Sequence, residues 1–201
     1  MTDTVLGWHF TSQTLKDGRP VPPVGEWLRH DGRIVLRKSG LHMSRRIIEA
    51  LEYASGPFIH RVEGRGDIQE ENGTLVCRER RILCGIDGRR LLREFARDCA
   101  LAVIHLWDAP DITRHYLGTL DENIRREVWR AAWGGTLSIA QCAAVSVSVE
   151  TSWNGAWYAA KYAADALNQA GDAKPATSMA RFNARLEAMF WAEAERQGDA
   201  S

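Results

Sequence analysis

Apolar and polar residues alternate over short distances in the first part of the chain, which is the pattern of β-strands. The pattern predicts strands over four segments, namely residues 5–10, 33–36, 58–63 and 74–86, the last as one long strand or two short ones. Residues 16–32 are rich in Pro, Gly and charge and predict a loop. Ser44 is a suitable N-cap for a helix over residues 45–54. Together these elements predict a small mixed α/β domain over residues 1–88.

From Arg89 onward the apolar positions recur at helical spacing instead. Helices are expected in five places: from Arg89 to Pro110, from the Thr119–Glu122 capping box to Trp133, over residues 136–149, around Trp153–Leu167 and around Phe182–Phe190. Residues 136–149 also fit a strand, because alternate positions carry Val, but their Ala content favours a helix. We therefore predict an α+β protein, in which the N-terminal domain is followed by an Ala/Trp-rich helical region over residues 89–201.

The helical region holds six of the eight Trp residues, namely Trp107, Trp129, Trp133, Trp153, Trp157 and Trp191. Small Ala residues let helices approach closely, and large Trp side chains fill the remaining gaps. We therefore expect Trp129, Trp153 and Trp157 to be largely buried in a tight helical core. The alternative is a groove in which exposed aromatic side chains anchor a partner protein.

The charge balance argues against one class of function. The 26 Lys and Arg residues are matched by 26 Asp and Glu residues, and no basic stripe is visible in the sequence. Sequence-independent binding of nucleic acid depends on such a stripe, so we expect no general nucleic-acid binding. The apolar share of 45% is ordinary for a folded protein and argues against disorder.

The four Cys residues form no CxxC pair and have no neighbouring His at zinc-site spacing. No metal site is therefore predicted, and the free thiols favour a reducing compartment. The first residues lack the basic and apolar regions of a signal peptide, and no apolar run reaches the ~20 residues that span a bilayer. We expect a cytoplasmic protein that does not associate with membranes.

Three segments of the N-terminal domain carry candidate chemistry. They are Trp8-His9-Phe10-Thr11-Ser12, then Gly40-Leu41-His42-Met43-Ser44 running into a helix with Ala50 and Tyr53, and finally Leu75–Leu83, which contains Glu79. In order and spacing they resemble the ADP-ribosyltransferase fold over about residues 5–85. In that family a His-bearing strand is followed by a Gly-led strand that enters a helix with Ala and Tyr, and then by a late strand with a catalytic Glu.

The resemblance implies a role for each of these side chains. His9 would hold the ribose of NAD, and His42 stands where the family has a Tyr that stacks on nicotinamide. Tyr53 would complete the cofactor site from the helix. Glu79 would be the catalytic carboxylate, which stabilises the positive charge of an oxocarbenium-like transition state. On its residues alone, His9 is also explained as a hydrogen-bonded strand His, and Glu79 as a surface residue among three Arg residues.

A second resemblance covers nearly the whole chain. The segments Lys38-Ser39-Gly40-Leu41-His42, Arg61-Val62-Glu63-Gly64-Arg65-Gly66 and Cys77–Leu83, with the tail around Asn183–Met189, resemble a domain of unknown function that is common in phage and prophage proteins. This resemblance implies an origin in a mobile element and no particular activity.

Two hypotheses about function follow, from different classes. The first is a phage or prophage accessory protein that binds another macromolecule, a protein partner of the host cytoplasm such as a component of host defence, and needs no cofactor. The alternative is an NAD-dependent ADP-ribosyltransferase-like enzyme.

Overall fold

The computed structural model describes residues 3–132, 137–148 and 151–198. It confirms the predicted α+β class, with a seven-stranded antiparallel sheet in the N-terminal half and 47% helix and 23% strand overall. Two compact units make up the chain. The first consists of residues 1–88 and 187–201, and the second of residues 89–186. The stretch 187–201, which the sequence groups with the helical region, is thus part of the unit that contains the sheet.

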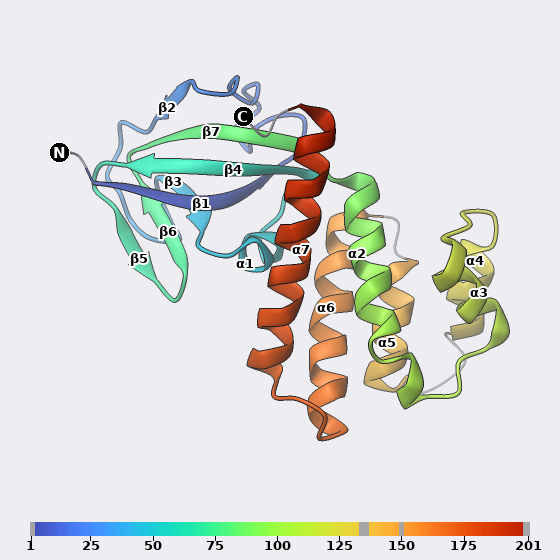
Figure 1. Ribbon diagram of the computed structural model, residues 1–201. Helices are drawn as coiled ribbons and strands as arrows, with labels where there is room; N and C mark the ends of the chain where they lie inside the picture. Colours follow the sequence, from blue (N-terminus) through green and yellow to red (C-terminus); the bar gives the residue numbers. More distant parts are fainter. Residues whose placement is uncertain (1–2, 133–136, 149–150, 199–201) are drawn as a thin grey trace. The chain divides into compact units, whose positions relative to one another are not determined.

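The first unit is built on the curved sheet drawn in Figure 1. Its elements are β1 (Thr4–Thr11), β2 (Trp27–Arg29), β3 (Leu41–Ser44), α1 (Ile47–Glu52), β4 (Phe58–Arg65), β5 (Gln69–Glu71), β6 (Thr74–Cys77) and β7 (Glu79–Asp87). The strand order is β2-β7-β4-β1-β3-β6-β5, and every neighbouring pair is antiparallel. The long strands β1, β4 and β7 form its centre, with β1 and β4 paired along their whole length.

Three local predictions for this unit were wrong. Residues 33–36 contribute only an isolated bridge between Val35 and Ser39, and the predicted loop contains β2 instead. Ser44 ends β3 and is buried, while the helix that follows begins at Ile47 without a side-chain cap. The physical reason is pairing: Ser44 lies opposite both Trp8 and Thr74 in the sheet, and this tertiary pairing outweighs its preference for a cap position.

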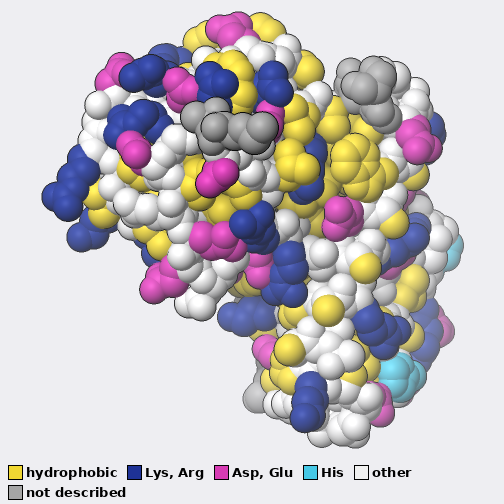
Figure 2. Space-filling view, turned by 60° about the vertical axis from the view of Figure 1, so that its left-hand side comes forward, with side chains coloured by type: hydrophobic (Ala, Val, Ile, Leu, Met, Phe, Trp, Pro, Cys, Tyr) yellow, Lys and Arg dark blue, Asp and Glu magenta, His cyan; other side chains and the backbone are white. Residues whose placement is uncertain are grey.

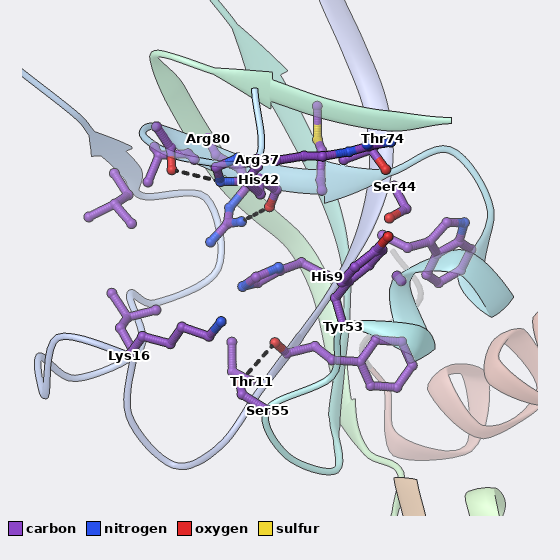
Figure 3. A pocket seen from close by; sticks show the side chains of 18 of the residues that line it. His9, Thr11, Lys16, Arg37, His42, Ser44, Tyr53, Ser55, Thr74 and Arg80 are labelled. Atoms are coloured by element: carbon purple, nitrogen blue, oxygen red, sulfur yellow. Dashed lines mark hydrogen bonds between the residues drawn. The ribbon is translucent and has the colours of Figure 1, made fainter. Parts of the chain in front are cut away.

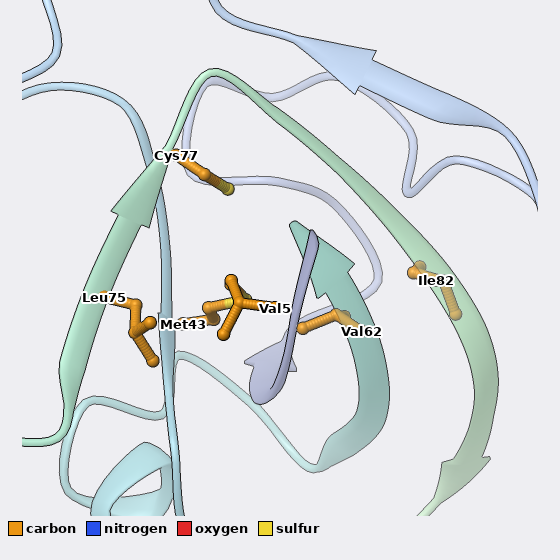
Figure 4. Close-up of a cluster of buried hydrophobic side chains, with 6 residues drawn as sticks. All are labelled: Val5, Met43, Val62, Leu75, Cys77 and Ile82. Carbon is orange, nitrogen blue, oxygen red and sulfur yellow. The ribbon is translucent and has the colours of Figure 1, made fainter. Parts of the chain in front are cut away.

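One face of the sheet closes over a small apolar core. Its six side chains, drawn in Figure 4, come from β1, β3, β4, β6 and β7: Val5, Met43, Val62, Leu75, Cys77 and Ile82. Gly64 belongs to the same face, and a Cβ there would come within 2.5 Å of Met43 and 2.7 Å of Cys77. The strands can approach this closely only because that position lacks a side chain.

The other face of β1 packs against helices. Trp8 is almost completely buried, and its ring meets that of Phe190 edge to face with centroids 4.8 Å apart. The guanidinium of Arg61 lies over the same Trp8 ring at 4.8 Å. Phe190 belongs to the part of α7 (Pro175–Gln197) that lies in the first unit. Helix α1 contributes Ile47, Ile48 and Leu51 to the buried residues of this unit.

The regular elements described in the second unit are all helices. Its elements are α2 (Arg89–Leu101), the 3-10 turn η1 (Ile104–Leu106), α3 (Asp111–Thr119), α4 (Arg125–Ala132), α5 (Ile139–Val147), α6 (Ser152–Gln169) and the first part of α7. The preference for helix over strand in residues 136–149 is confirmed by α5, although residues 136 and 149 lie outside the described part of the chain. Helices α2, α5 and α6 pack side by side (Figure 1).

Two predicted helix boundaries in this unit were wrong. Pro110 does not end a long helix but begins α3, and α2 already stops at Leu101. Thr119 closes α3 rather than capping the next helix, because Leu120 adopts a left-handed conformation with a φ of 54°. The capping box of this unit is formed instead by Ser138 and Gln141 at the start of α5.

The expectation that Trp fills the helical core was also wrong in part. Trp129 is 43% exposed, Trp153 and Trp157 are half-buried, and Trp133 lies outside the described residues. The buried seam consists of Ala instead, namely Ala140, Ala143 and Ala144 of α5 and Ala156, Ala159, Ala160, Ala163 and Ala164 of α6. Helices that meet through Ala leave little space between them, so Trp153 and Trp157 lie at the margin of the seam.

No described helix is both long enough and apolar enough to cross a membrane. On the face drawn in Figure 2, acidic and basic side chains are interspersed rather than gathered by sign.

Candidate functional site

A cavity of about 520 Å³ lies within the first unit. One part of its wall comes from the end of β1, from β3 and from Arg80 of β7. The remainder comes from the end of α1 and from the segments before and after β2. Figure 3 shows that labelled side chains from these segments surround one common space. The size is typical of sites that hold a small organic ligand.

His9 projects from β1 into this cavity (Figure 3). Because side chains alternate along a strand, His9 faces away from its buried neighbours Trp8 and Phe10. Protein atoms surround the ring densely, yet part of its surface faces the cavity. Burial lowers the pKa of His9 well below its ordinary value, and Arg80 acts in the same direction. His9 is therefore neutral at pH 7, and neither ring nitrogen has a hydrogen-bond partner among the described residues.

His42 reaches the same cavity from β3. Its Nδ1 lies 3.1 Å from the carbonyl oxygen of Gly40, so this nitrogen carries the proton of the neutral ring. The contact depends on Gly40, which has a φ of 122° and would place a Cβ only 2.5 Å from Val76. The Nε2 atom of His42 is buried and has no partner in the described part of the chain. Burial lowers the pKa of His42, so it too is neutral at pH 7.

Tyr53 and Thr11 complete the same wall. Tyr53 follows α1, lines the cavity and is 59% exposed, so its ring lies at the mouth of the cavity. Thr11 is buried at the end of β1, where its hydroxyl lies 2.8 Å from Nε2 of His60 on the paired strand β4. His60 thus fixes the Thr11 hydroxyl beside the cavity, and burial lowers the pKa of His60 to about 4.

Arg80 supplies a buried positive charge to the cavity. The residue is only 7% exposed, and its Nη1 donates a hydrogen bond to the carbonyl oxygen of His42. Among the described residues no carboxylate pairs with the guanidinium, and burial lowers its pKa to about 10. A buried charge without a counter-ion is costly for a folded protein. In a cavity wall, such a group leaves room for an anion as its counter-ion.

Further cations surround the mouth of the cavity. Lys16, Arg19, Arg37 and Lys38 line it and are exposed. Among the described lining residues the only carboxylate is that of Asp17, which Arg19 already holds at 2.7 Å. The cavity is therefore positively charged although the chain as a whole has a net charge of +0. Low-dielectric walls of one sign concentrate ions of the opposite sign.

Glu79 does not line this cavity. It precedes Arg80 in β7, so the alternation of the strand directs the two side chains to opposite faces. The Glu79 carboxylate accepts a hydrogen bond from Nε of Arg65 at 2.5 Å and pairs with Arg29 at 3.4 Å. The structure thus brings together three of the four residues singled out in the sequence, His9, His42 and Tyr53, and places the carboxylate of Glu79 elsewhere.

Sequence reasoning missed Arg80, although a signal was present. Arg80 stands two positions before Ile82 and shares its buried face, so the strand alternation indicates an inward-facing Arg. The cations of the cavity mouth gave no such signal, because they lie in irregular segments whose course follows from tertiary contacts.

The described residues contain no group of three or more His, Cys, Asp or Glu side chains that is arranged to hold a metal ion. Comparison of the chain with family models, with curated proteins and with solved structures finds no match.

Proposed function

We propose that the first unit binds an anionic nucleotide-type ligand in the cavity around His9, and that NAD or its ADP-ribose part is a ligand of this class. The observation that carries the proposal is the unpaired guanidinium of Arg80 in the cavity wall. A phosphate or diphosphate group supplies the missing negative charge and accepts charge-assisted hydrogen bonds from Arg.

The remaining wall suits the other parts of a nucleotide. Tyr53 offers an exposed ring at the mouth of the cavity, against which a planar base can stack. The hydroxyl of Ser44 is a polar group for ribose or amide, and the unpartnered nitrogens of His9 face the same cavity. The exposed cations Lys16 and Lys38 attract the ligand and match a second phosphate.

The proposal is for binding and includes no ADP-ribosyl transfer. Transfer of the kind implied by the family resemblance needs a carboxylate beside the ribose, and Glu79 is engaged by Arg65 and Arg29 outside the cavity. The protein partner and the phage origin stay predictions. Trp129 and Tyr158 of the second unit are exposed, but scattered aromatic residues are normal on protein surfaces and favour no particular partner.

Isothermal titration calorimetry with NAD and with ADP-ribose tests the proposal. We expect both to bind to the wild-type protein, and Arg80→Met to weaken binding by roughly 10- to 100-fold, since a hydrogen bond to a charged group contributes about 1.5–3 kcal/mol. Arg90→Met is the matched control, because Arg90 is exposed on α2 in the second unit. It should bind like the wild type.

A measurement of stability accompanies the titration, so that a folding defect is not mistaken for a lost contact. Removal of an unpaired buried charge should leave the free energy of unfolding of Arg80→Met unchanged or increase it. The proposal is contradicted if wild-type protein binds neither ligand at millimolar concentration. It is also contradicted if Arg80→Met binds both with wild-type affinity.

A further inference from the structure

We propose that His9 is the second binding group for the anion, beside Arg80, and that it takes up a proton when the ligand binds. This inference rests on the proposed function and concerns the protonation state in which the site works. It starts from three His residues that lie near one another, His9 on β1, His42 on β3 and His60 on β4, of which His9 and His42 line the cavity.

His9 differs from the other two in its freedom to bind a ligand. His42 is held through Nδ1 by the carbonyl of Gly40, and its Nε2 is buried. His60 is held through Nε2 by Thr11, and its Nδ1 is buried. Both nitrogens of His9 lack a partner in the described part of the chain, and the ring faces the cavity in Figure 3.

The charges around His9 explain why its protonation depends on the ligand. Burial is the main cause of the low pKa of His9, because it disfavours the charged imidazole. Arg80 on β7, His60 and His42 on the neighbouring strands, and Lys16 in the segment after β1 lower this pKa further, since each is cationic or can become so. An anion that binds between Arg80 and His9 reverses the local potential and favours the imidazolium form, which then donates to the anion.

The sign of the pH dependence follows from this coupling between anion binding and protonation of His9. In the free protein the pKa of His9 lies below its ordinary value, and the bound anion raises it. Binding therefore takes up a proton at any pH between the two values. Affinity should increase as the pH falls, by up to about tenfold per pH unit for one coupled proton.

ADP-ribose is a suitable probe, because its diphosphate bears only ester-type phosphates that stay fully ionised between pH 6 and 8. Calorimetric titrations in two buffers of different ionisation enthalpy, neither of them phosphate, count the protons taken up. We expect a clear uptake, above roughly 0.3 proton per ligand at pH 6.5, for the wild-type protein. We expect almost none for His9→Gln, which keeps a hydrogen-bonding side chain but does not titrate. His115→Gln, at an exposed position of the second unit, should behave like the wild type.

Proton NMR of the wild-type imidazoles gives an answer that does not depend on any variant. The pKa of His9 should rise when ADP-ribose is added. ADP-ribose binding without proton uptake, or with an unchanged His9 pKa, overturns this inference and leaves the proposed function intact. Uptake that persists in His9→Gln assigns the proton to another group and overturns it as well. Absence of any ADP-ribose binding removes both proposals.

Discussion

Arg80 and Glu79 are neighbours in the chain, yet the sheet gives them opposite surroundings. The guanidinium of Arg80 faces a cavity without a counter-ion, whereas the carboxylate of Glu79 lies between two Arg side chains. Nearby, the ring of Trp27 is covered by the guanidinium groups of Arg65 at 3.9 Å and Arg81 at 4.8 Å. Glu79 thus belongs to a cluster of charged side chains beside the Trp27 ring, and its members come from β2, β4 and β7.

A substitution at Glu79 separates a structural role from a catalytic one. Glu79→Gln removes the charge and keeps the shape. Because the two ion pairs of Glu79 are partly exposed, we expect the free energy of unfolding to fall by only about 1 kcal/mol. The affinity for ADP-ribose should stay within twofold of the wild-type value. Urea denaturation and calorimetry measure the two quantities. A more than tenfold loss of affinity in a folded Glu79→Gln protein would show that the carboxylate takes part in the site.

At the scale of elements, the sheet was easier to predict than the segments that border it. The strands β1, β4 and β7 have long apolar alternations, and the sequence places each within a few residues of its observed bounds. The three-residue strand β2 has no such pattern, since it exists only because Trp27–Arg29 pairs with β7. The cavity mouth could not be predicted for the same reason, because Lys16 and Lys38 come from irregular segments on either side of β2.

The helical unit illustrates a different limit. Periodicity identified where most helices lie, but not which residues fill the space between them. Ala160 is fully buried in α6, whereas Trp157, one turn earlier, is only half-buried. Helical spacing marks a common face of these residues but does not show how closely the neighbouring helix approaches.

The alanine seam predicts high sensitivity to added volume. Ala160→Leu forces the methylenes of a larger side chain between α6 and its neighbours, which should lower the free energy of unfolding by about 1–3 kcal/mol. Ala131→Leu, in contrast, adds the same volume at an exposed position of α4 and should change the free energy of unfolding by less than about 0.5 kcal/mol. Urea denaturation followed by circular dichroism compares the two. An equal effect of Ala160→Leu and Ala131→Leu would contradict the tight packing of the seam.

At the scale of the whole molecule, the buried His residues link folding to pH. Burial lowers the pKa of His60 to about 4, whereas an unfolded chain leaves it at its ordinary value near 6.5. The unfolded state thus binds the proton more readily, so stability is lost as the pH falls through this window and levels off below about 4. The His60 contribution is up to about 3 kcal/mol, since each pKa unit corresponds to ~1.4 kcal/mol.

Denaturation of the wild type at pH 7, 6, 5 and 4.5 should show this loss, and His60→Gln should reduce its slope. Gln keeps a polar group near Thr11 but has no proton to bind in this range. His115→Gln should keep the wild-type slope, because His115 is exposed. An identical pH dependence of wild type and His60→Gln would contradict the assignment of the proton to His60.

The central claim is that the cavity around Arg80 and His9 binds the anionic part of a nucleotide. A crystal structure of the protein with ADP-ribose tests it most directly. We predict that a phosphate oxygen lies within hydrogen-bond distance of the Arg80 guanidinium, with His9 as the neighbouring contact and the adenine or the terminal ribose toward Tyr53. A crystal in which saturating ADP-ribose binds elsewhere, or leaves the cavity empty, would contradict the account.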